Sequence, residues 1–503
     1  MNSHFKNNTF TIVPRPKNHN VVSTKFIWKV KYPETAEPIF KSRWVARGFS
    51  QNYGEDYTDT HAPTPKATTI RFLMAHAAGN NLYAYHFDVE TAFLIAEIDK
   101  IIYAEQPAGY LDPQYPPEDY VLLLNKGLYG LKQSAWLWSN HVKNTLLSLG
   151  FRQSDADETV YIQQNGKHIT IIAVYVDDFL VISDTIERIN NLESQLSESY
   201  TIKNLGPVKR FLGLDIYRPT ETGPIFLSQS TYSRKILHRF GMQNCNPAKA
   251  PFADTSQLHK RTDNEEPTDE KLYREIVGSI GYLSTYTRPD LAFPVSKLSQ
   301  YLSNPSIHHM QAAKHVLRYI KGTLDYCICY SASPSESHPF GYSDASHAAD
   351  PDDRKSHSGY IFFYNNGDIT HSSSKQPITA LSSMESEYIE LTNAAQEAIF
   401  LRKLYHSITG NNIDIPTTIL TDSEAALNHT KNNVNHARTK HIDTRFHYIR
   451  EVHATNQVDL YHIPAAEQAA DILTKPLGLT KHAEAVKLLQ LTTFPFKTAF
   501  SRL

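Results

Sequence analysis

The sequence predicts a multidomain α+β protein, and three observations lead to that prediction. The chain has 503 residues, enough for roughly three domains at about 150 residues each. Stretches with the apolar spacing of helices and stretches that alternate as strands occur in both halves of the chain. A Ser- and Pro-containing stretch at 331–339 (SASPSESHP) separates the halves, and we expect a domain boundary there.

The first half is expected to mix strands and helices along the chain. Segment 82–89 (LYAYHFDV) alternates as a strand and carries Asp88 at its end, and segment 168–176 is an apolar strand that stops at two aspartates. The other elements predicted in this half are helices at 68–78, 140–150, 186–199 and 232–240 and a strand at 160–163.

The second half begins with a polar stretch at about 245–270, which is expected to be a long surface connection. Helical and strand patterns then follow one another to the end of the chain. The helices are predicted at 271–286, 290–303, 308–321, 384–405, 423–430 and from about 466, and the strands at 340–344, 358–364, 417–421 and 457–463.

Composition excludes several classes of protein. Apolar residues make up 41% and charged residues 20% of the chain, which excludes disorder as the main state. With 50 Lys and Arg against 52 Asp and Glu, the chain is not strongly basic. Three Cys cannot build a disulfide framework, so we expect a reducing, intracellular location, cytoplasmic or nuclear. No apolar run reaches about 18 residues, so neither a membrane span nor a membrane partner is expected, and we expect no signal peptide.

Two adjacent aspartates interrupt an apolar run, ITIIAVYVDDFLVIS at 169–183. Asp177 and Asp178 are costly to bury unpaired, but a tight hairpin can bring both near one point, where Mg²⁺ would relieve their repulsion. The alternative is a plain, solvent-exposed Asp-Asp hairpin. Asp88 ends another strand, and three carboxylates from two strand ends form a plausible two-metal phosphoryl-transfer site.

The segment YVDD at 175–178 resembles the signature of reverse transcriptases, and the chain around it resembles the Pol protein of Ty1/copia retrotransposons. The ordered set of matching segments is far more specific than a lone Asp-Asp pair. The segments are KSRWVARGFSQ at 41–51, FDVETAFL at 87–94, IYAEQPAGY at 102–110, LYGLKQ at 128–133 and LGPVKRFLGLDI at 205–216.

The resemblance implies a right-hand polymerase of fingers, palm and thumb. It implies that two Mg²⁺ ions, or Mn²⁺ in their place, are held by Asp88, Val89, Asp177 and Asp178. Phe93 would be the steric gate that favours dNTPs over ribonucleotides, although it could also be an ordinary core Phe.

Further substrate contacts are implied by the same resemblance. Lys41, Arg43 and Arg47 match the fingers motif that neutralises the incoming triphosphate, with a solvated basic strand as the alternative. Lys132 and Gln133 match the segment beneath the templating pair, and FLG at 211–213 resembles the primer grip.

Four acids lie on four predicted elements after the Ser/Pro stretch, and spacing alone does not group them. Each could be a surface charge or, for Asp422, a helix cap. The segments GYSDASHAADPDDRKSHSGY, ALSSMESEYIEL, LTDSEAAL and ADILTKPL resemble the copia-type ribonuclease H domain over about 340–477. The resemblance implies an α/β domain in which two Mg²⁺ ions are held by Asp344, Glu387, Asp422 and Asp471, with Glu385 as a close competitor of Glu387.

Three other features remain open. The basic, aromatic segment 438–450 could follow a phosphate backbone or pack as an ordinary helix. His441 and His462 could assist product release, although a structural role is the simpler interpretation. Ala135 and His347 stand where the family usually has Pro and Trp, which suggests a drifted copy.

The resemblance implies an RNA-directed DNA polymerase with ribonuclease H activity. Its partners would be an RNA template, a DNA or tRNA primer, dNTPs and the RNA–DNA hybrid. The alternative is a relic that only binds nucleic acid or only cleaves hybrids. The expected domains are fingers and palm at 1–222, a thumb-like segment at 223–250, a connection at 251–336, the ribonuclease H-like domain at 337–480 and a tail at 481–503.

Overall fold

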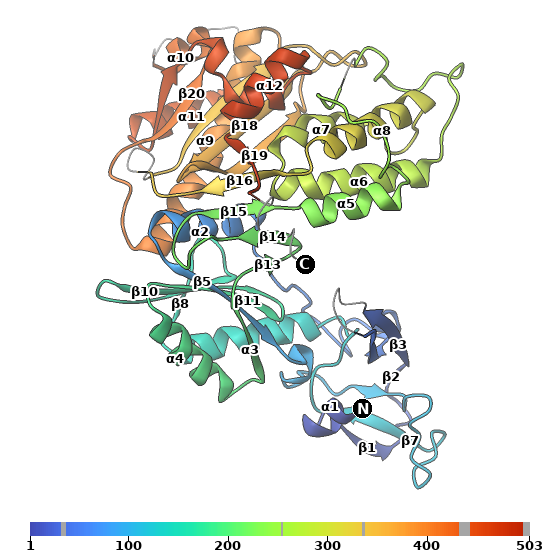
Figure 1. Ribbon diagram of the computed structural model, residues 1–503. Coiled ribbons are helices and arrows are strands. Elements are labelled where there is room, and N and C mark those ends of the chain that lie inside the picture. The colour runs from blue at the N-terminus through green and yellow to red at the C-terminus, as the bar shows by residue number, and fades with distance from the viewer. Residues whose placement is uncertain (32–36, 253–254, 334–337, 432–442, 496–503) are drawn as a thin grey trace. The chain divides into compact units, whose positions relative to one another are not determined.

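The computed structural model describes residues 1–31, 37–252, 255–333, 338–431 and 443–495 (Figure 1). They form two compact units, each built from separate stretches of the chain. Unit 1 comprises Met1–Pro65, Tyr85–Ser154 and Glu158–Gly206, and unit 2 comprises Lys66–Ala84, Asp155–Asp157 and Pro207–Leu503. The predicted domain bounds stay predictions. His441 and the start of the basic segment at 438–442 lie outside the described residues.

Unit 1 begins with short strands around a small apolar core. A four-stranded sheet has the order β1-β7-β6-β2, and β3 pairs with β4 as a separate antiparallel hairpin. Trp44 of β4, only 1% exposed, belongs to this core. The elements are α1 (Asn2–Lys6), β1 (Phe10–Pro14), β2 (Val21–Val22), β3 (Thr24–Lys31), β4 (Ile39–Ala46), β6 (Tyr103–Ala104) and β7 (Tyr120–Leu124).

A six-stranded sheet of order β12-β5-β11-β10-β9-β8 carries the paired aspartates. Helices α3 and α4 accompany it (Figure 1). Its central strands are rich in buried Ile, Val and Leu. The elements are β5 (Tyr83–Val89), α3 (Ser134–Ser148), β8 (Arg152–Gln153), β9 (Val160–Asn165), β10 (His168–Tyr175), β11 (Asp178–Ser183), α4 (Ile186–Ser197) and β12 (Ile202–Pro207).

Unit 2 contains a helical cluster next to a second, five-stranded sheet of order β13-β14-β15-β16-β22. The helices share one apolar core that includes Tyr273, Leu317 and Ile320. The elements are β13 (Arg210–Phe211), β14 (Leu214–Tyr217), β15 (Ile225–Ser228), α5 (Ser230–Arg239), α6 (Glu270–Tyr286), α7 (Ala292–Ser299), α8 (Ile307–Gly322), β16 (Tyr326–Tyr330) and β22 (Leu491–Thr493).

The remaining part of unit 2 is a mixed sheet of order β19-β18-β17-β20-β21. Strands β17, β18 and β19 are antiparallel, whereas β20 and β21 run parallel to β17. The long helix α9 packs on β17 and β18. The elements are β17 (Phe340–Ser346), β18 (His357–Tyr364), β19 (Gly367–Lys375), α9 (Ser383–Thr409), β20 (Thr417–Thr421), α10 (Glu424–Lys431), α11 (Asp443–Ala454), β21 (Val458–His462) and α12 (Leu479–Leu488).

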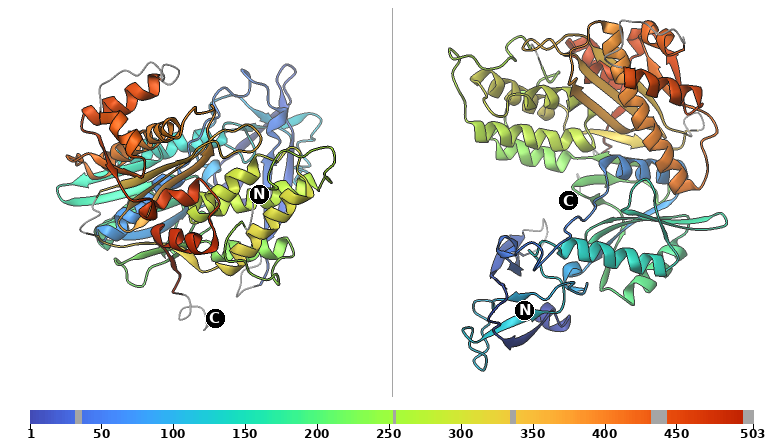
Figure 2. Two further views of the ribbon diagram at one scale, coloured as in Figure 1. Left: turned by 90° about the horizontal axis from the view of Figure 1, so that it is seen from above. Right: turned by 180° about the vertical axis from the view of Figure 1, so that it is seen from behind.

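Helix α2 (Ala67–Gly79) comes early in the sequence but belongs to unit 2. It lies against β16 and β19, and the views in Figures 1 and 2 show the same arrangement. Buried Arg71 of α2 forms an ion pair of 3.1 Å with buried Asp368 of β19. This ion pair joins two residues that are 297 positions apart in the sequence, and it fixes α2 to the mixed sheet.

Most predicted helices and strands are confirmed to within a few residues. Two helix predictions are wrong in extent. The helix predicted from about 466 is instead two 3-10 helices, Ala465–Glu467 and Ala469–Leu473, and α12 begins only at Leu479, because Pro476 stands between them. The helix predicted at 290–303 is a 3-10 turn followed by α7, which ends at Ser299. Among the described residues, no helix has the length and apolarity to cross a membrane.

Candidate active sites

The first site lies where β5 meets the β10–β11 hairpin. Asp88 is next to last in β5, and the N–H of Val89 donates a hydrogen bond of 2.8 Å to the carbonyl of Asp177. Tyr175 pairs with Asp178 across the hairpin, so Val176 and Asp177 form a two-residue loop. The predicted tight turn between the two apolar strands is confirmed, and it brings Asp177 next to the end of β5.

Val176 holds this loop in an unusual conformation. Its φ of +56° lies in the left-handed region, which a β-branched residue enters only at a cost of about 1–3 kcal/mol. The indole N–H of Trp138, on α3, donates a hydrogen bond of 2.6 Å to the Val176 carbonyl. Buried Trp138 thus stabilises the strained turn that presents Asp177.

The three predicted acids of this site have different surroundings. Burial, together with the charges of Asp178 and Asp88, raises the pKa of Asp177. Asp178 instead accepts a hydrogen bond of 2.7 Å from Nε2 of His86. The structure therefore brings Asp88 and Asp177 together and engages Asp178 with a residue that sequence reasoning missed. His86 could have been noticed, because it lies two residues before Asp88 on the same strand face.

Tyr129 connects the predicted substrate residues with the acids. The ring of Phe93 packs edge-on against Tyr129, with centroids 5.1 Å apart. The guanidinium of Arg43 lies 5.4 Å from the centroid of the same ring. Burial raises the pKa of Tyr129, the charge of Arg43 opposes this, and the charges of Asp177 and Asp88 add to it. Phe93 and Arg43 therefore both contact Tyr129 of the LYGLKQ segment, and their roles at the substrate stay predictions.

The other predicted substrate residues are exposed or take part in other contacts. Lys41 and Arg47 are exposed, within and just after β4. Nζ of Lys132 donates a hydrogen bond of 2.8 Å to the hydroxyl of Tyr57. Gln133 is fully buried and donates a hydrogen bond of 2.7 Å to the Asp56 carbonyl. Gln133 is thus positioned to support the loop, and substrate contact by these residues stays a prediction. In unit 2, the predicted primer-grip segment 211–213 links β13 to β14.

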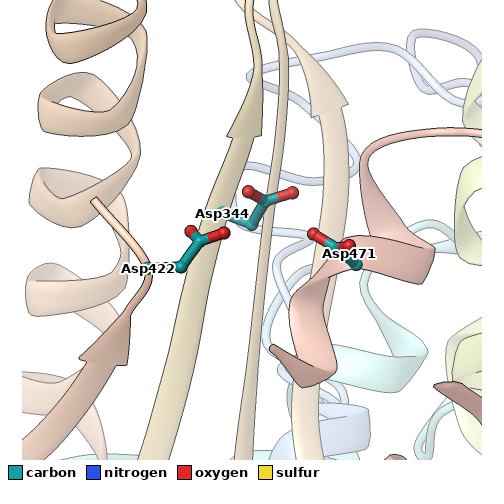
Figure 3. A group of neighbouring side chains, drawn as sticks. All are labelled: Asp344, Asp422 and Asp471. Atoms are coloured by element: carbon teal, nitrogen blue, oxygen red, sulfur yellow. The ribbon is translucent and has the colours of Figure 1, made fainter. Parts of the chain in front are cut away.

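The second site lies in unit 2, at the ends of several elements of the mixed sheet. Asp344 comes from β17, Asp422 directly follows β20, and Asp471 comes from the 3-10 helix Ala469–Leu473. One carboxylate oxygen from each lies within 4.8 Å of the others (Figure 3). Across the described residues, this is the one group of three or more such side chains that meets this distance. Sequence spacing did not group these acids, but the fold does.

Glu387, on α9, completes the acidic group. The backbone N–H of Ala345 hydrogen-bonds to its carboxylate, and burial and the charges of Asp344 and Asp422 raise its pKa well above the usual value. Its Oε2 is buried and has no hydrogen-bond partner among the described residues. Glu385 instead accepts a hydrogen bond of 2.9 Å from the N–H of Leu381. The geometry therefore favours Glu387 over Glu385 in this cluster.

Two further residues of the ADILTKPL segment reach this site and were missed. The hydroxyl of Thr474 donates a hydrogen bond to Asp344. Nζ of Lys475 lies 2.7 Å from Oδ1 of Asp471 and 3.7 Å from Oδ2 of Asp344. His462 is exposed at the end of β21. An all-oxygen donor set with an unpartnered, buried carboxylate oxygen fits a divalent cation such as Mg²⁺.

The part of the chain that contains the first site matches a known protein family. A family model described as reverse transcriptase (RNA-dependent DNA polymerase) matches residues 7–254, the part that contains Asp88, Asp177 and Asp178. The protein of transposon Ty5-1 in Saccharomyces cerevisiae is 34% identical over 311 residues, which cover 62% of this chain and 99% of that protein. The chain belongs to the Ty1/copia retrotransposon Pol family.

Longer relatives match nearly the whole chain. The retrovirus-related Pol polyprotein from transposon TNT 1-94 of Nicotiana tabacum is 35% identical over 488 residues, covering 96% of this chain and 36% of the relative. The corresponding polyprotein from transposon RE1 of Arabidopsis thaliana is 34% identical over 499 residues, covering 98% and 33%. The chain thus spans about one third of the length of these curated relatives.

Solved structures share the fold at low sequence identity. A foamy viral protease-reverse transcriptase in complex with double-stranded DNA matches with a TM-score of 0.53 and 14% identity, over 92% of this chain and 68% of that chain. The same viral protein in complex with an RNA/DNA hybrid matches with a TM-score of 0.50 and 14% identity, over 95% and 54%. The predicted fold class, multidomain α+β with the fold of a reverse transcriptase, is confirmed.

Proposed function

We propose that the chain is an RNA-directed DNA polymerase of a copia-type retrotransposon that also cleaves the RNA strand of RNA–DNA hybrids. The observation that carries the proposal is the family match over 7–254 together with Asp88 and Asp177 at the meeting point of β5 and the β10–β11 hairpin. The acidic group of unit 2 supports the second activity.

At the polymerase site, Asp88, Asp177, Asp178 and the carbonyl of Val89 would hold Mg²⁺, or Mn²⁺ in its place. The bound ions would lower the pKa of the primer 3′-hydroxyl and stabilise charge on the transferred phosphoryl group. Arg43, close to Tyr129, would neutralise the triphosphate together with Lys41 and Arg47.

At the hybrid-cleaving site, Asp344, Glu387, Asp422 and Asp471 would hold the metal. There a bound ion would activate the attacking water and stabilise the leaving oxygen. Thr474 would keep Asp344 in place through the hydroxyl hydrogen bond to its carboxylate. The hybrid would be recognised through its shape and its 2′-hydroxyl groups.

The partners follow from this chemistry: an RNA template, a DNA or tRNA primer, dNTPs and the RNA–DNA hybrid. Two foamy viral structures that share the fold are complexes with double-stranded DNA and with an RNA/DNA hybrid, which supports nucleic-acid partners. Copying of element RNA would take place inside the cell, in the cytoplasm or nucleus.

The two-site proposal is tested by separating the activities. Asp177→Asn should abolish dNTP incorporation on an RNA template and leave hybrid cleavage intact, because the sites use different acids. Glu387→Gln should do the opposite. Primer extension and cleavage of a labelled hybrid, each in Mg²⁺ and in Mn²⁺, measure the two activities. Loss of both activities in either variant, with the protein still folded, would refute the assignment.

Phe93 gives a second test, of sugar selection. Its ring packs on Tyr129 near the acids, so a shorter side chain should make room for a ribose 2′-hydroxyl. Phe93→Val should raise ribonucleotide incorporation relative to dNTP incorporation by about tenfold or more. The measurement is single-nucleotide extension with dNTP and rNTP in parallel. An unchanged ratio of rNTP to dNTP incorporation would refute the steric-gate role of Phe93.

A nuclease-only protein is the second candidate, and one observation favours it. The acids of unit 2 bring three oxygens within 4.8 Å of one another, whereas Asp178 of the polymerase site is engaged by His86. Hybrid cleavage without primer extension would select this candidate. Nucleic-acid binding without either activity would identify a silent relic.

A further inference from the structure

Lys475 contacts two members of the acidic group of unit 2 directly. Its ammonium is 2.7 Å from Asp471 and 3.7 Å from Asp344, and so reaches two of the four predicted metal ligands. The Asp344 side chain is only 4% exposed, whereas that of Lys475 is 37% exposed. The cation therefore reaches the buried acid from the open side of the site.

The backbone holds Lys475 in this place. The N–H groups of Thr474 and Lys475 donate hydrogen bonds of 3.2 and 3.3 Å to the Asp471 carbonyl, so ligand and lysine lie on one tight turn. The hydroxyl of Thr474 binds Asp344 from the same turn, and Pro476 follows directly. A freely rotating surface lysine would lack this support.

One positive charge does not balance the site. Lys475 makes ion pairs with Asp344 and Asp471, but Oε2 of Glu387, buried in the same group, has no partner among the described residues. The group therefore sets four carboxyl groups against one lysine, and the Glu387 oxygen is left for a divalent cation. A cation approaching Asp344 and Asp471 meets the ammonium at the same two side chains, and like charges a few ångströms apart repel.

We propose that Lys475 is the resident counter-ion of this site: it holds Asp344 and Asp471 in place when no metal is bound, and metal binding displaces its ammonium from them. The proposal rests on the metal site of the proposed function. Lys475 is thus a positioning residue that sets the metal concentration at which the site fills. It stabilises the metal-free protein and weakens metal binding, two effects that a purely structural lysine would not combine.

The test measures metal binding and stability on the full chain. Asp88→Asn and Asp177→Asn are introduced as a common background, so that calorimetric titration with MgCl₂ reports on unit 2. Lys475→Met keeps the length of the side chain without its charge, Lys475→Gln removes the charge but keeps hydrogen-bond donors, and Lys475→Arg keeps the charge. Lys481→Met, at an exposed lysine of α12, is the matched control.

Lys475→Met and Lys475→Gln should bind Mg²⁺ roughly tenfold more tightly than the background protein. In EDTA both should melt about 2 °C lower, and saturating MgCl₂ should remove that difference. Lys475→Arg and Lys481→Met should bind as the background protein does.

Two other outcomes are informative: one would refute the role of Lys475, and the other would refute the metal site itself. If the background protein binds Mg²⁺ but removal of the Lys475 charge leaves the affinity unchanged or weakens it, the counter-ion role is wrong and the metal site stands. If neither the background protein nor the charge-free variants bind Mg²⁺ in unit 2, the metal site of the proposed function is wrong, and the counter-ion role falls with it.

Discussion

Asp178 and Asp344 are both predicted metal ligands, yet each has a different kind of partner. Asp178 accepts a hydrogen bond from His86, whose side chain is 13% exposed. Because an ionised carboxylate only accepts hydrogen bonds, Nε2 of His86 carries the hydrogen. Asp344 is instead held by Thr474 and by the ammonium of Lys475. The sequence could point to these acids, because an apolar or aromatic run meets each of them, but which partner each acid takes depends on the fold.

His86 should therefore orient Asp178. His86→Ala should lower the free energy of unfolding by about 1–2 kcal/mol, at the low end for a hydrogen bond to a charged group because Asp178 is partly exposed, and it should reduce primer extension. His86→Gln, which retains a donor, should recover part of both, and hybrid cleavage should not change in either variant. Urea denaturation and the two activity assays measure these effects, and wild-type stability with full extension in His86→Ala would contradict the role.

The elements of the fold were easier to predict than their ends. Strand 417–421 is found with the predicted bounds because an apolar run stops at Asp422. The segment after Pro464 has apolar residues at helical spacing but forms two 3-10 helices, since Asp471 and Thr474 are drawn into the acidic group. Tertiary contacts of this kind override local propensity, and spacing along the chain does not reveal them.

Helix α2 gives a pH prediction at the scale of one element. Burial lowers the pKa of His76 from 6.5 to about 4, and Nδ1 of His76 lies 3.2 Å from the Tyr364 hydroxyl. The unfolded chain takes up the proton near pH 6.5, whereas the folded chain resists until about pH 4. The contribution of His76 to the free energy of unfolding is therefore constant above pH 6.5. As the pH falls from 6.5 to 4, this contribution decreases by about 1.4 kcal/mol per pH unit.

Replacing His76 should make the free energy of unfolding less dependent on pH below about pH 6.5. Between pH 7.5 and pH 5, His76→Asn should lose about 2 kcal/mol less than the wild type, as measured by urea denaturation followed in unit 2. His238→Asn, at an exposed histidine of α5, should leave the pH dependence as it is. Equal pH dependence in His76→Asn and the wild type would show that burial of His76 does not control acid stability.

At the scale of the whole molecule, the units do not follow the order of the sequence. The predicted boundary at 331–339 separates two halves of the chain, but α2 and Asp155–Asp157 belong with the residues after Pro207. No pattern within 67–79 indicates that its partner is β19, almost 300 residues away. Periodicity in the sequence predicts helix α2 and its apolar face. Which sheet that face packs against depends on the fold of the complete chain.

This discontinuity predicts how the chain can be divided. A fragment of residues 207–503 lacks α2, whose residues 69–78 are all buried, and leaves fully buried Asp368 with His371 but without Arg71. Removing one partner of a buried ion pair costs up to about 3–5 kcal/mol, and the surface that α2 covers becomes exposed, so the fragment should aggregate or unfold without cooperativity. A synthetic peptide of residues 66–84 should restore a cooperative melting transition, and the same peptide with Arg71→Met should do so less well. A fragment that melts cooperatively by itself, unaffected by either peptide, would mean that α2 is not an integral part of unit 2.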